Sequence, residues 1–437
     1  MAREKMASDS TEKSNYKYYV LLVLALVYLS NYIDRSIMAV ISPAVKEDLG
    51  LSDTQLGLLK GLSFALFYAA LCIPVAWLAE RWRRVPIISV SVMIWSVFTA
   101  LAAFAGNFFQ LFLTRVGVGI AEAGGVAPSH SLISDYFKKE ERGRALALYS
   151  MAVDAGDAIA LLLGGILLQQ FGWRFVFLII GIPGVLLALV LWATVKEPIR
   201  GAMDGPSQRS QPQSEPLGFF ESIKALWSIG SYRYLVYSAI AVDFAASGFW
   251  FWMVDHFERS FELSYVEITT PLAVITVLFS VSGTYTSGYL TDKLHLRTAK
   301  SNGYVGALSA GMSAPLLIVF LLAPTPFWSF VAVAGLFYFI TMYLPTVYAG
   351  AQTIAPAHLR TVSASLLFAA TILFGVGCAP LVVGLLSDFV APFFGEANGL
   401  KVAISAMSIV FVLGVFLFLQ TGRRMAAEAA LAEEAAH

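Results

Sequence analysis

The sequence predicts an all-α membrane protein in which twelve transmembrane helices form two bundles of six. Three observations support this fold class. Of the 437 residues, 58% are hydrophobic and only 13% are charged, whereas soluble domains carry roughly 25% charged residues. Apolar segments long enough to cross a hydrocarbon core about 30 Å thick recur along the chain. Lys and Arg concentrate in the loops on one side of these segments.

The predicted spans follow one another with short loops, apart from one long break after the sixth span. Gly and Pro inside the spans are compatible with transmembrane helices, because neighbouring helices satisfy the freed backbone groups. The spans are expected at residues 17–41, 55–80, 86–105, 107–135, 142–170, 174–195, 232–257, 267–291, 300–323, 326–354, 360–389 and 395–421.

The basic residues also set the expected orientation. The N-terminal tail and the loops that share its side hold most of the Lys and Arg, so both termini are expected in the cytoplasm of a multi-pass inner-membrane protein. The predicted parts are a tail (1–16), a first bundle (17–195), a cytoplasmic linker (196–231), a second bundle (232–421) and a tail (422–437). The linker is rich in Gly, Pro, Ser and Gln, but its end, Leu217 to Trp227, has the apolar spacing of a surface helix.

Two charged residues, Asp34 and Arg35, lie inside the first apolar segment. They are about seven residues from its far end, and so roughly 10 Å below that surface. An ionised side chain at such a depth costs at least about 2.5–3.5 kcal/mol and usually marks an ion or substrate pathway. The alternative is a structural pair of adjacent opposite charges. We interpret Asp34 as functional.

A second pair, Arg115 and Glu122, lies in the fourth span. Seven residues nearly complete two helical turns, so the two side chains point the same way. We predict that Asp34 is the main protonation site and Glu122 a second one. Arg35 and Arg115 would tune these carboxylates or hold an anionic headgroup in a bidentate manner. The alternative for Arg115 and Glu122 is a fixed ion pair.

A short sequence pattern is repeated in the two halves of the chain. Glu80-Arg81 follows the second span and Asp292-Lys293 follows the eighth, each after a small residue and a Leu at the same offsets. Such a repeat is typical of transporters and predicts a cytoplasmic gate at the interface of the halves. A positive-inside loop without a gate is the alternative. The predicted gate residues are Glu80, Arg81, Arg84, Asp292, Lys293, Asp135 and Arg142.

The six-plus-six pattern, this repeat and Gly172-Trp173-Arg174-Phe175 resemble the major facilitator superfamily. The first loop differs from the family pattern, with Ala76 in place of a leading Gly and Arg83 where a Gly is usual. Within the superfamily the chain is similar to the Spinster subfamily. This likeness rests on Asn31-Tyr32-x-Asp34-Arg35, Thr114-Arg115-x-Gly117-Val118-Gly119-x-x-Glu122-Ala123, Ala127-Pro128, Leu132-Ile133-x-Asp135, Phe137 and Lys196-Glu197-Pro198.

The resemblance implies a function as well as a fold. It implies that spans 1 and 4 line a central cavity and that the substrate is an amphiphilic lipid of the lysophospholipid or sphingoid type. A proton-coupled, alternating-access transporter of such a lipid is therefore the leading prediction. A drug/proton antiporter of the same fold and an organic-anion/proton symporter, with Arg35 and Arg115 on the anion's carboxylate, are the alternatives.

Other ionisable residues inside spans remain secondary candidates. Asp154 and Asp157 lie one turn apart in span 5 and would form a hydrogen-bonded pair with one proton, while Asp243 lies in span 7. Lys60 in span 2 is expected to extend outward to the membrane surface.

Enzymatic function is not expected, since the sequence has no Gly-rich phosphate loop, nucleophile elbow or metal-spaced His set. The predicted coupling ion is the proton, with no cofactor and no metal. The expected partners are a small amphiphilic or lipid substrate and membrane lipids, without nucleic acid, for a monomeric chain. A channel is the remaining class, and saturable, proton-dependent flux would separate a carrier from it.

Overall fold

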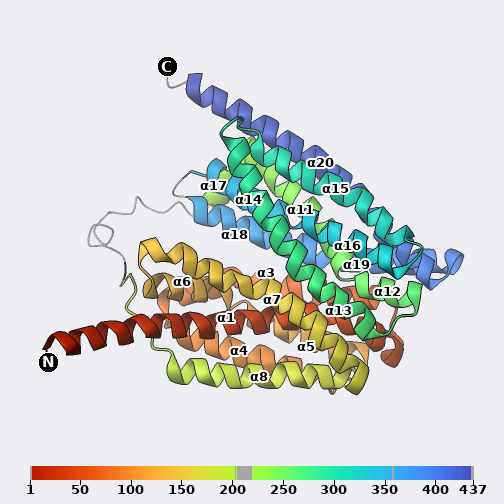
Figure 1. Ribbon diagram of the computed structural model, residues 1–437, viewed down its shortest axis with the longest axis horizontal. Coiled ribbons are helices and arrows are strands. Elements are labelled where there is room, and N and C mark those ends of the chain that lie inside the picture. The colour runs from red at the N-terminus through yellow and green to blue at the C-terminus, as the bar shows by residue number, and fades with distance from the viewer. Residues whose placement is uncertain (1, 202, 204–218, 357–358, 435–437) are drawn as a thin grey trace. The chain divides into compact units, whose positions relative to one another are not determined.

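The computed structural model describes residues 2–201, 203, 219–356 and 359–434, and this part of the chain contains helices but no strands. The chain divides into two compact units, as Figure 1 allows the reader to trace by colour. The first unit is Met1–Ile37 with Leu66–Ser214, and the second is Met38–Ala65 with Glu215–His437. A segment from the first half of the sequence, residues 38–65, therefore belongs to the second unit.

The first unit is built from long helices. In it, α4 and α8 run side by side (Figure 1). Its elements are α1 (Ala2–Leu49) up to Ile37, α3 (Leu62–Arg81) from Leu66, α4 (Arg84–Ala102), α5 (Phe108–Glu122), α6 (Val126–Tyr136), α7 (Lys139–Phe171) and α8 (Trp173–Thr194).

The second unit holds the end of α1 and the start of α3, together with more interrupted helices. α20 lies against both α15 and α11 (Figure 1). Its elements are α2 (Asp53–Lys60), α10 (Phe219–Ser228), α11 (Gly230–Trp250), α12 (Met253–Phe261), α13 (Tyr265–Ile275), the π-helix η1 (Thr276–Ser280), α14 (Val281–His295), α15 (Ser301–Leu322), α16 (Pro326–Ile340), α17 (Tyr343–Ile354), α18 (Arg360–Ala370), the π-helix η3 (Thr371–Gly377), α19 (Cys378–Phe394) and α20 (Glu396–Glu434).

The predicted fold class is confirmed, although several predicted spans are interrupted. In the described chain, eleven helical stretches are long and apolar enough to cross a membrane. The remaining predicted span, 107–135, is divided into α5 and α6 by a turn at Ala123–Gly125. Gly124 explains this turn. A Cβ at this position would overlap the Ser91 side chain of α4, so the close approach of α4 requires glycine here. Glycine is also unfavourable inside a helix, which favours a break at this point.

Both tails and the linker differ in part from a simple loop description. α1 begins well before the predicted start at residue 17, and α20 continues past the predicted end at residue 421. The helix expected at the end of the linker is present as α10. Residues 202 and 204–218 of the linker and 435–437 of the tail lie outside the described residues, and the predicted domain boundaries stay a prediction.

The two halves share one backbone feature that the loop repeat did not reveal. Gly172 ends α7 with φ 78° and ψ 167°, and Gly395 ends α19 with φ 82° and ψ 161°. Only glycine adopts this region at low cost. Each glycine joins the fifth and sixth predicted spans of its own half, so the same turn has been kept at equivalent places.

Small residues let α2 and α19 approach within backbone contact. A Cβ on Gly57 would overlap the carbonyl of Pro380, and one on Gly384 would overlap the carbonyl of Asp53. Membrane helices associate through such close contacts because lipid tails offer no hydrophobic driving force. This packing fixes residues 53–60 against the second half of the sequence.

Packing of α15 against α20 gives a matched test of this principle. A Cβ at Gly303 would lie 2.6 Å from the Phe418 carbonyl oxygen, whereas a Cβ at Gly311 would meet Val415 at an ordinary 3.5 Å. Gly303→Ala is expected to destabilise the protein by about 1–3 kcal/mol through overpacking. Gly311→Ala should be neutral or stabilising, because Ala favours a helix over Gly by up to about 1 kcal/mol. Thermal unfolding in detergent measures both, and equal melting temperatures for the two variants would contradict the prediction.

Candidate functional site

Asp34 lies on α1 in a fully buried ion pair of the first unit. Its side chain is 1% exposed. The Arg115 Nη1 of α5 lies 2.8 Å from Asp34 Oδ1, and Arg115 Nη2 also donates to the Asp34 backbone carbonyl. The Thr99 hydroxyl of α4 donates to Asp34 Oδ2. The carboxylate is thus held by three helices, with a charge-assisted bond from the always-charged guanidinium.

Arg35, the next residue on α1, pairs with the other predicted acid. Its Nε lies 2.7 Å from Glu122 Oε2, and Glu122 is completely buried. The guanidinium also lies over the rings of Tyr68 and Tyr32, at 4.8 and 5.3 Å from their centroids. Glu122 is the last residue of α5, where the helix dipole disfavours an anion. Arg35 supplies the positive charge that offsets this effect.

These contacts define a crossed pair of ion pairs, Asp34–Arg115 and Arg35–Glu122. The residues adjacent in sequence, Asp34 and Arg35, do not neutralise each other, and Arg115 and Glu122 do not pair along their own helix. Two polar atoms of these ion pairs, Arg115 Nε and Glu122 Oε1, are buried without a hydrogen-bond partner among the described residues. Burying such atoms costs on the order of 1–3 kcal/mol each. The two ion pairs are therefore incompletely satisfied.

Asp157 extends this cluster from α7. The Ser36 hydroxyl of α1 donates to Asp157 Oδ1. Gly156 lets the two helices approach, because a Cβ there would lie 2.7 Å from the Tyr32 Cβ. The sequence predicts a hydrogen bond between Asp154 and Asp157. The hydrogen bond that Asp157 forms in the described structure comes from Ser36 instead. Asp154 is half-buried one turn away.

Among the predicted gate residues of the first unit, Asp135 forms an ion pair with Arg84. The Arg84 side chain is 1% exposed and lies 2.5 Å from Asp135 Oδ2 and 2.8 Å from Glu197 Oε1. Burial alone raises the pKa of Glu197, yet the Val85 N–H and the Arg84 guanidinium hold that pKa below its usual range. Glu197 therefore stays ionised at neutral pH and ties the start of the linker to α4.

The other predicted gate residues are placed less tightly. Arg142 donates to the carbonyls of Ser134 and Phe137, and Arg81 stacks on Trp77 at 3.6 Å. Glu80, Asp292 and Lys293 are exposed. The role of this set as a gate stays a prediction.

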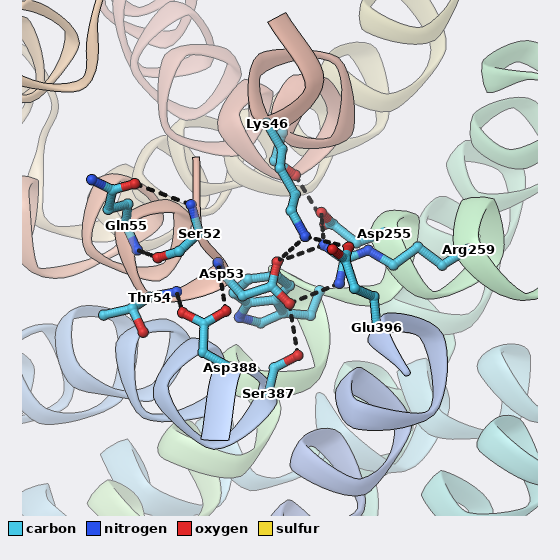
Figure 2. A network of polar contacts seen from close by, with 12 residues as sticks. Lys46, Ser52, Asp53, Thr54, Gln55, Asp255, Arg259, Ser387, Asp388 and Glu396 are labelled. Carbon is cyan, nitrogen blue, oxygen red and sulfur yellow. Dashed lines mark hydrogen bonds and ion pairs between the residues drawn. The ribbon is translucent and has the colours of Figure 1, made fainter. Parts of the chain in front are cut away.

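A second buried charge cluster lies in the second unit, and sequence reasoning missed it. Figure 2 shows the Asp53 carboxylate at its centre. Both Asp53 oxygens accept from Arg259, at 2.7 Å each, and Ser387 donates to Oδ2 at 2.6 Å. Lys46 lies 3.0 Å from Asp53 and 2.7 Å from the exposed Glu396. We call Lys46, Asp53, Lys60, Asp255, Arg259 and Ser387 the latch.

Within the latch, Lys60 and Asp255 are both entirely buried. Lys60 Nζ lies 2.7 Å from Asp255 Oδ2, and the ammonium group sits 3.6 Å from the Trp252 ring centroid. The Ser42 hydroxyl donates to the same carboxylate oxygen. The expectation that Lys60 extends to the surface is therefore wrong, because a buried carboxylate and an aromatic face stabilise its charge internally.

Asp388 fixes the latch to the start of α2. Its carboxylate accepts from the backbone N–H groups of Asp53 and Thr54, at 3.0 and 2.8 Å. These are orphan donors of a helix N-terminus, which Ser52 also caps through a capping box with Gln55 (Figure 2). An anion at this end also interacts favourably with the helix dipole. Ionisable residues in or near apolar segments, the signal that identified Asp34, would also have identified the latch. Lys60, Asp53 and Asp255 lie in this way near the ends of predicted spans.

Comparison with known proteins gives a consistent identification. The family model of the Major Facilitator Superfamily matches residues 24–379. A crystal structure of a bacterial homologue of the human lysosomal transporter Spinster, inward-facing and unoccupied, superimposes with a TM-score of 0.83 and 29% identity. The match covers 94% of this chain and 98% of that one.

Relatives with similar sequences carry several names. An MFS-type efflux pump of Mycolicibacterium smegmatis is 28% identical and covers 92% of both chains. A probable L-galactonate transporter of Escherichia coli is 26% identical over 66% of this chain and 64% of its own length. Protein spinster homolog 1 of Xenopus tropicalis is 26% identical over 93% and 81%. With the family model covering most of the chain and the Spinster likeness extending along nearly all of it, this protein belongs to the Major Facilitator Superfamily and is a transporter of the Spinster type.

Proposed function

We propose that this transporter moves an amphiphilic lipid of the lysophospholipid or sphingoid type by proton-coupled alternating access. Asp34 is its main protonation site and Glu122 the second. The protein acts as a monomer in an inner membrane, with both termini in the cytoplasm. The observation that supports the mechanism is the crossed pair of ion pairs, in which each acid holds an arginine that a substrate anion would otherwise engage.

Proton binding and anion binding use the same guanidinium in this arrangement. While Asp34 is ionised, Arg115 is occupied by its carboxylate at 2.8 Å. A proton on Asp34 removes that negative charge and leaves Arg115, which does not deprotonate, as an uncompensated cation. The freed guanidinium fork then suits a phosphate or carboxylate headgroup. By linkage, a bound headgroup also strengthens proton binding at Asp34 to the same degree.

The Thr99 hydroxyl, which contacts the Asp34 carboxylate, lowers the free-energy cost of this exchange. Thr99 donates to the ionised carboxylate. A hydroxyl can also accept, so the same contact survives when Asp34 carries the proton. The proton therefore changes the ion pair with Arg115 while the hydrogen bond to α4 is kept.

The latch supplies the conformational part of the proposal. It holds residues 42–60 to α12 through buried ion pairs and to α19 through the Ser387 hydrogen bond to Asp53. Alternating access requires one such contact to break while another forms. On the charge-based orientation this segment is on the outer side, so the latch would be an outer contact of this kind.

An organic-anion/proton symporter is the second candidate. The relative named as a probable L-galactonate transporter favours it, as does the pairing of arginines with carboxylates, since a sugar acid would offer the same anionic group. The Spinster likeness along nearly the whole chain favours the lipid.

The first prediction concerns the proton site. Asp34→Asn keeps the size and the Thr99 hydrogen bond but removes the titrating group. Distances between probes at the exposed Trp82 and Leu296 should shift between about pH 5.5 and about pH 8 in the wild type and stay fixed in the variant. Asp154→Asn, which changes a half-buried acid on α7, is the matched control and should still switch. Persistent pH-driven switching in Asp34→Asn would refute the assignment.

The second prediction separates the two substrates. Arg115→Lys keeps the charge but loses the bidentate fork, and should weaken binding of the true substrate about 10-fold, equivalent to about 1.4 kcal/mol. Binding of a lysophospholipid and of galactonate to the purified protein would be measured by calorimetry. A loss for the lysophospholipid supports the lipid carrier. Saturable galactonate binding that Arg115→Lys weakens, with no lipid binding, would replace it by the symporter.

The third prediction concerns the latch. Arg259→Gln leaves Asp53 buried without its bidentate partner and should cost the latched state on the order of 3–5 kcal/mol. Glu396→Gln removes only an exposed contact to Lys46 and should cost about 0–1 kcal/mol. Probes at Glu47 and Asn398 report latch opening as a longer distance. Equal distance distributions in both variants would show that the ion pairs do not hold the segment.

A further inference from the structure

Asp243 on α11 is a buried carboxyl that the mechanism above does not use. The Tyr343 hydroxyl lies 2.5 Å from Asp243 Oδ1. Asp243 Oδ2 is shielded from solvent and has no hydrogen-bond partner in the described part of the chain. Asp34, Glu122, Asp53 and Asp255 each contact an arginine or a lysine. No described residue forms an ion pair with Asp243, which sets it apart from these acids.

The backbone around Asp243 is irregular on two sides. Tyr343 is the first residue of α17, directly after the turn at Thr341–Met342 that separates α17 from α16. Opposite lies η3, a π-helix inserted between α18 and α19. π-helices are rare in proteins, and those that occur are frequently found at functional sites. Within a membrane, irregular backbone is tolerated only where protein buries it or where it lines a watery cavity.

Gly375 of η3 makes the room that the carboxyl occupies. A Cβ at this position would overlap Asp243, with the Asp243 Cγ 2.7 Å away. The π-helix thus presents a residue without a side chain to the one oxygen of Asp243 that lacks a partner. Asp243, Tyr343 and Gly375 together form a small site around one carboxyl group.

An ionised carboxylate in this site would be poorly compensated. One hydrogen bond from a phenol replaces the several that water provides, and burial without a counter-charge disfavours the charged form. Among the described residues of the elements packed against α11, Tyr343 on α17 is the titratable residue with a hydrogen bond to Asp243. The Asp243–Tyr343 contact suits both charge states, because the phenol donates to a carboxylate and accepts from a carboxylic acid.

We propose that Asp243 and Tyr343 form a proton-binding site of the second unit, additional to Asp34 and Glu122 in the first. A proton from water adds to Oδ1, the Asp243 hydroxyl then donates to the Tyr343 oxygen, and release reverses both steps. The inference rests on the proposed proton coupling for its role in transport, and adds a proton site in the second unit to the two proposed in the first. Gly375 positions the carboxyl by leaving Oδ2 unobstructed.

Infrared difference spectroscopy tests this site on the purified full-length protein without any substrate. Spectra recorded between about pH 5 and about pH 9 report protonated carboxyl groups through their C=O stretching band. Asp243→Asn should remove one component of this band. Tyr343→Phe, which removes only the hydroxyl, should keep the component and shift its frequency. Asp154→Asn, the matched control, should leave that component unchanged.

The outcomes separate this site from the proposed function. Asp34→Asn should leave the Asp243 component of the infrared band in place even though it stops pH-driven switching. The infrared band therefore tests the Asp243 site, and the probe distances test Asp34, independently of each other. A band that Asp243→Asn does not alter would overturn the site. So would a carboxylate that stays ionised over the whole range and responds to replacing Na⁺ by choline, because it would then bind a metal cation instead.

Discussion

The pairing of Asp34 with Arg115 constrains the whole first unit. Two opposite charges inside an apolar bundle are stable only while they meet, so α1 and α5 have to present them at the same depth. The Thr99 hydrogen bond fixes the position of α4 against α1, and the Arg35–Glu122 pair is a second constraint on α1 and α5. Replacing such pairs by apolar residues is often neutral or stabilising. Stability alone therefore does not account for their presence here.

Both units hold buried charge that is only partly satisfied. In the first unit Arg115 Nε and Glu122 Oε1 lack hydrogen-bond partners among the described residues. In the latch, Asp53 accepts from Arg259 twice and from Ser387, and its helix is capped by Asp388, but Asp255 Oδ1 lacks a hydrogen-bond partner among the described residues. Within the latch, Asp53 is therefore the fully bonded carboxylate and Asp255 the incompletely bonded one.

Much of the fold could be predicted from the sequence, because membrane spans leave a strong apolar signal. The cost of burying charge singles out Asp34, Arg35, Arg115 and Glu122, and the family resemblance, which implies that spans 1 and 4 line one cavity, predicts that they lie together. Their crossed partners could not, since helix periodicity fixes the direction of a side chain but not which neighbouring helix it meets. Lys60 shows the same limit: a long cation can reach a surface or a buried acid, and only packing decides. The break after Glu122 depends on a close contact at Gly124 that no local pattern reveals.

α1 belongs to both units, since the boundary between Ile37 and Met38 falls within one unbroken helix. Asp34 and Ser42 are eight residues apart on it, about 12 Å along its axis. One continuous helix therefore carries Asp34 of the first unit and Ser42 of the second, where the Ser42 hydroxyl donates to Asp255. Pro43 follows Ser42 and lacks a backbone N–H, so α1 has one backbone hydrogen bond fewer at this turn. The helix can therefore bend more easily at Pro43 than around Asp34.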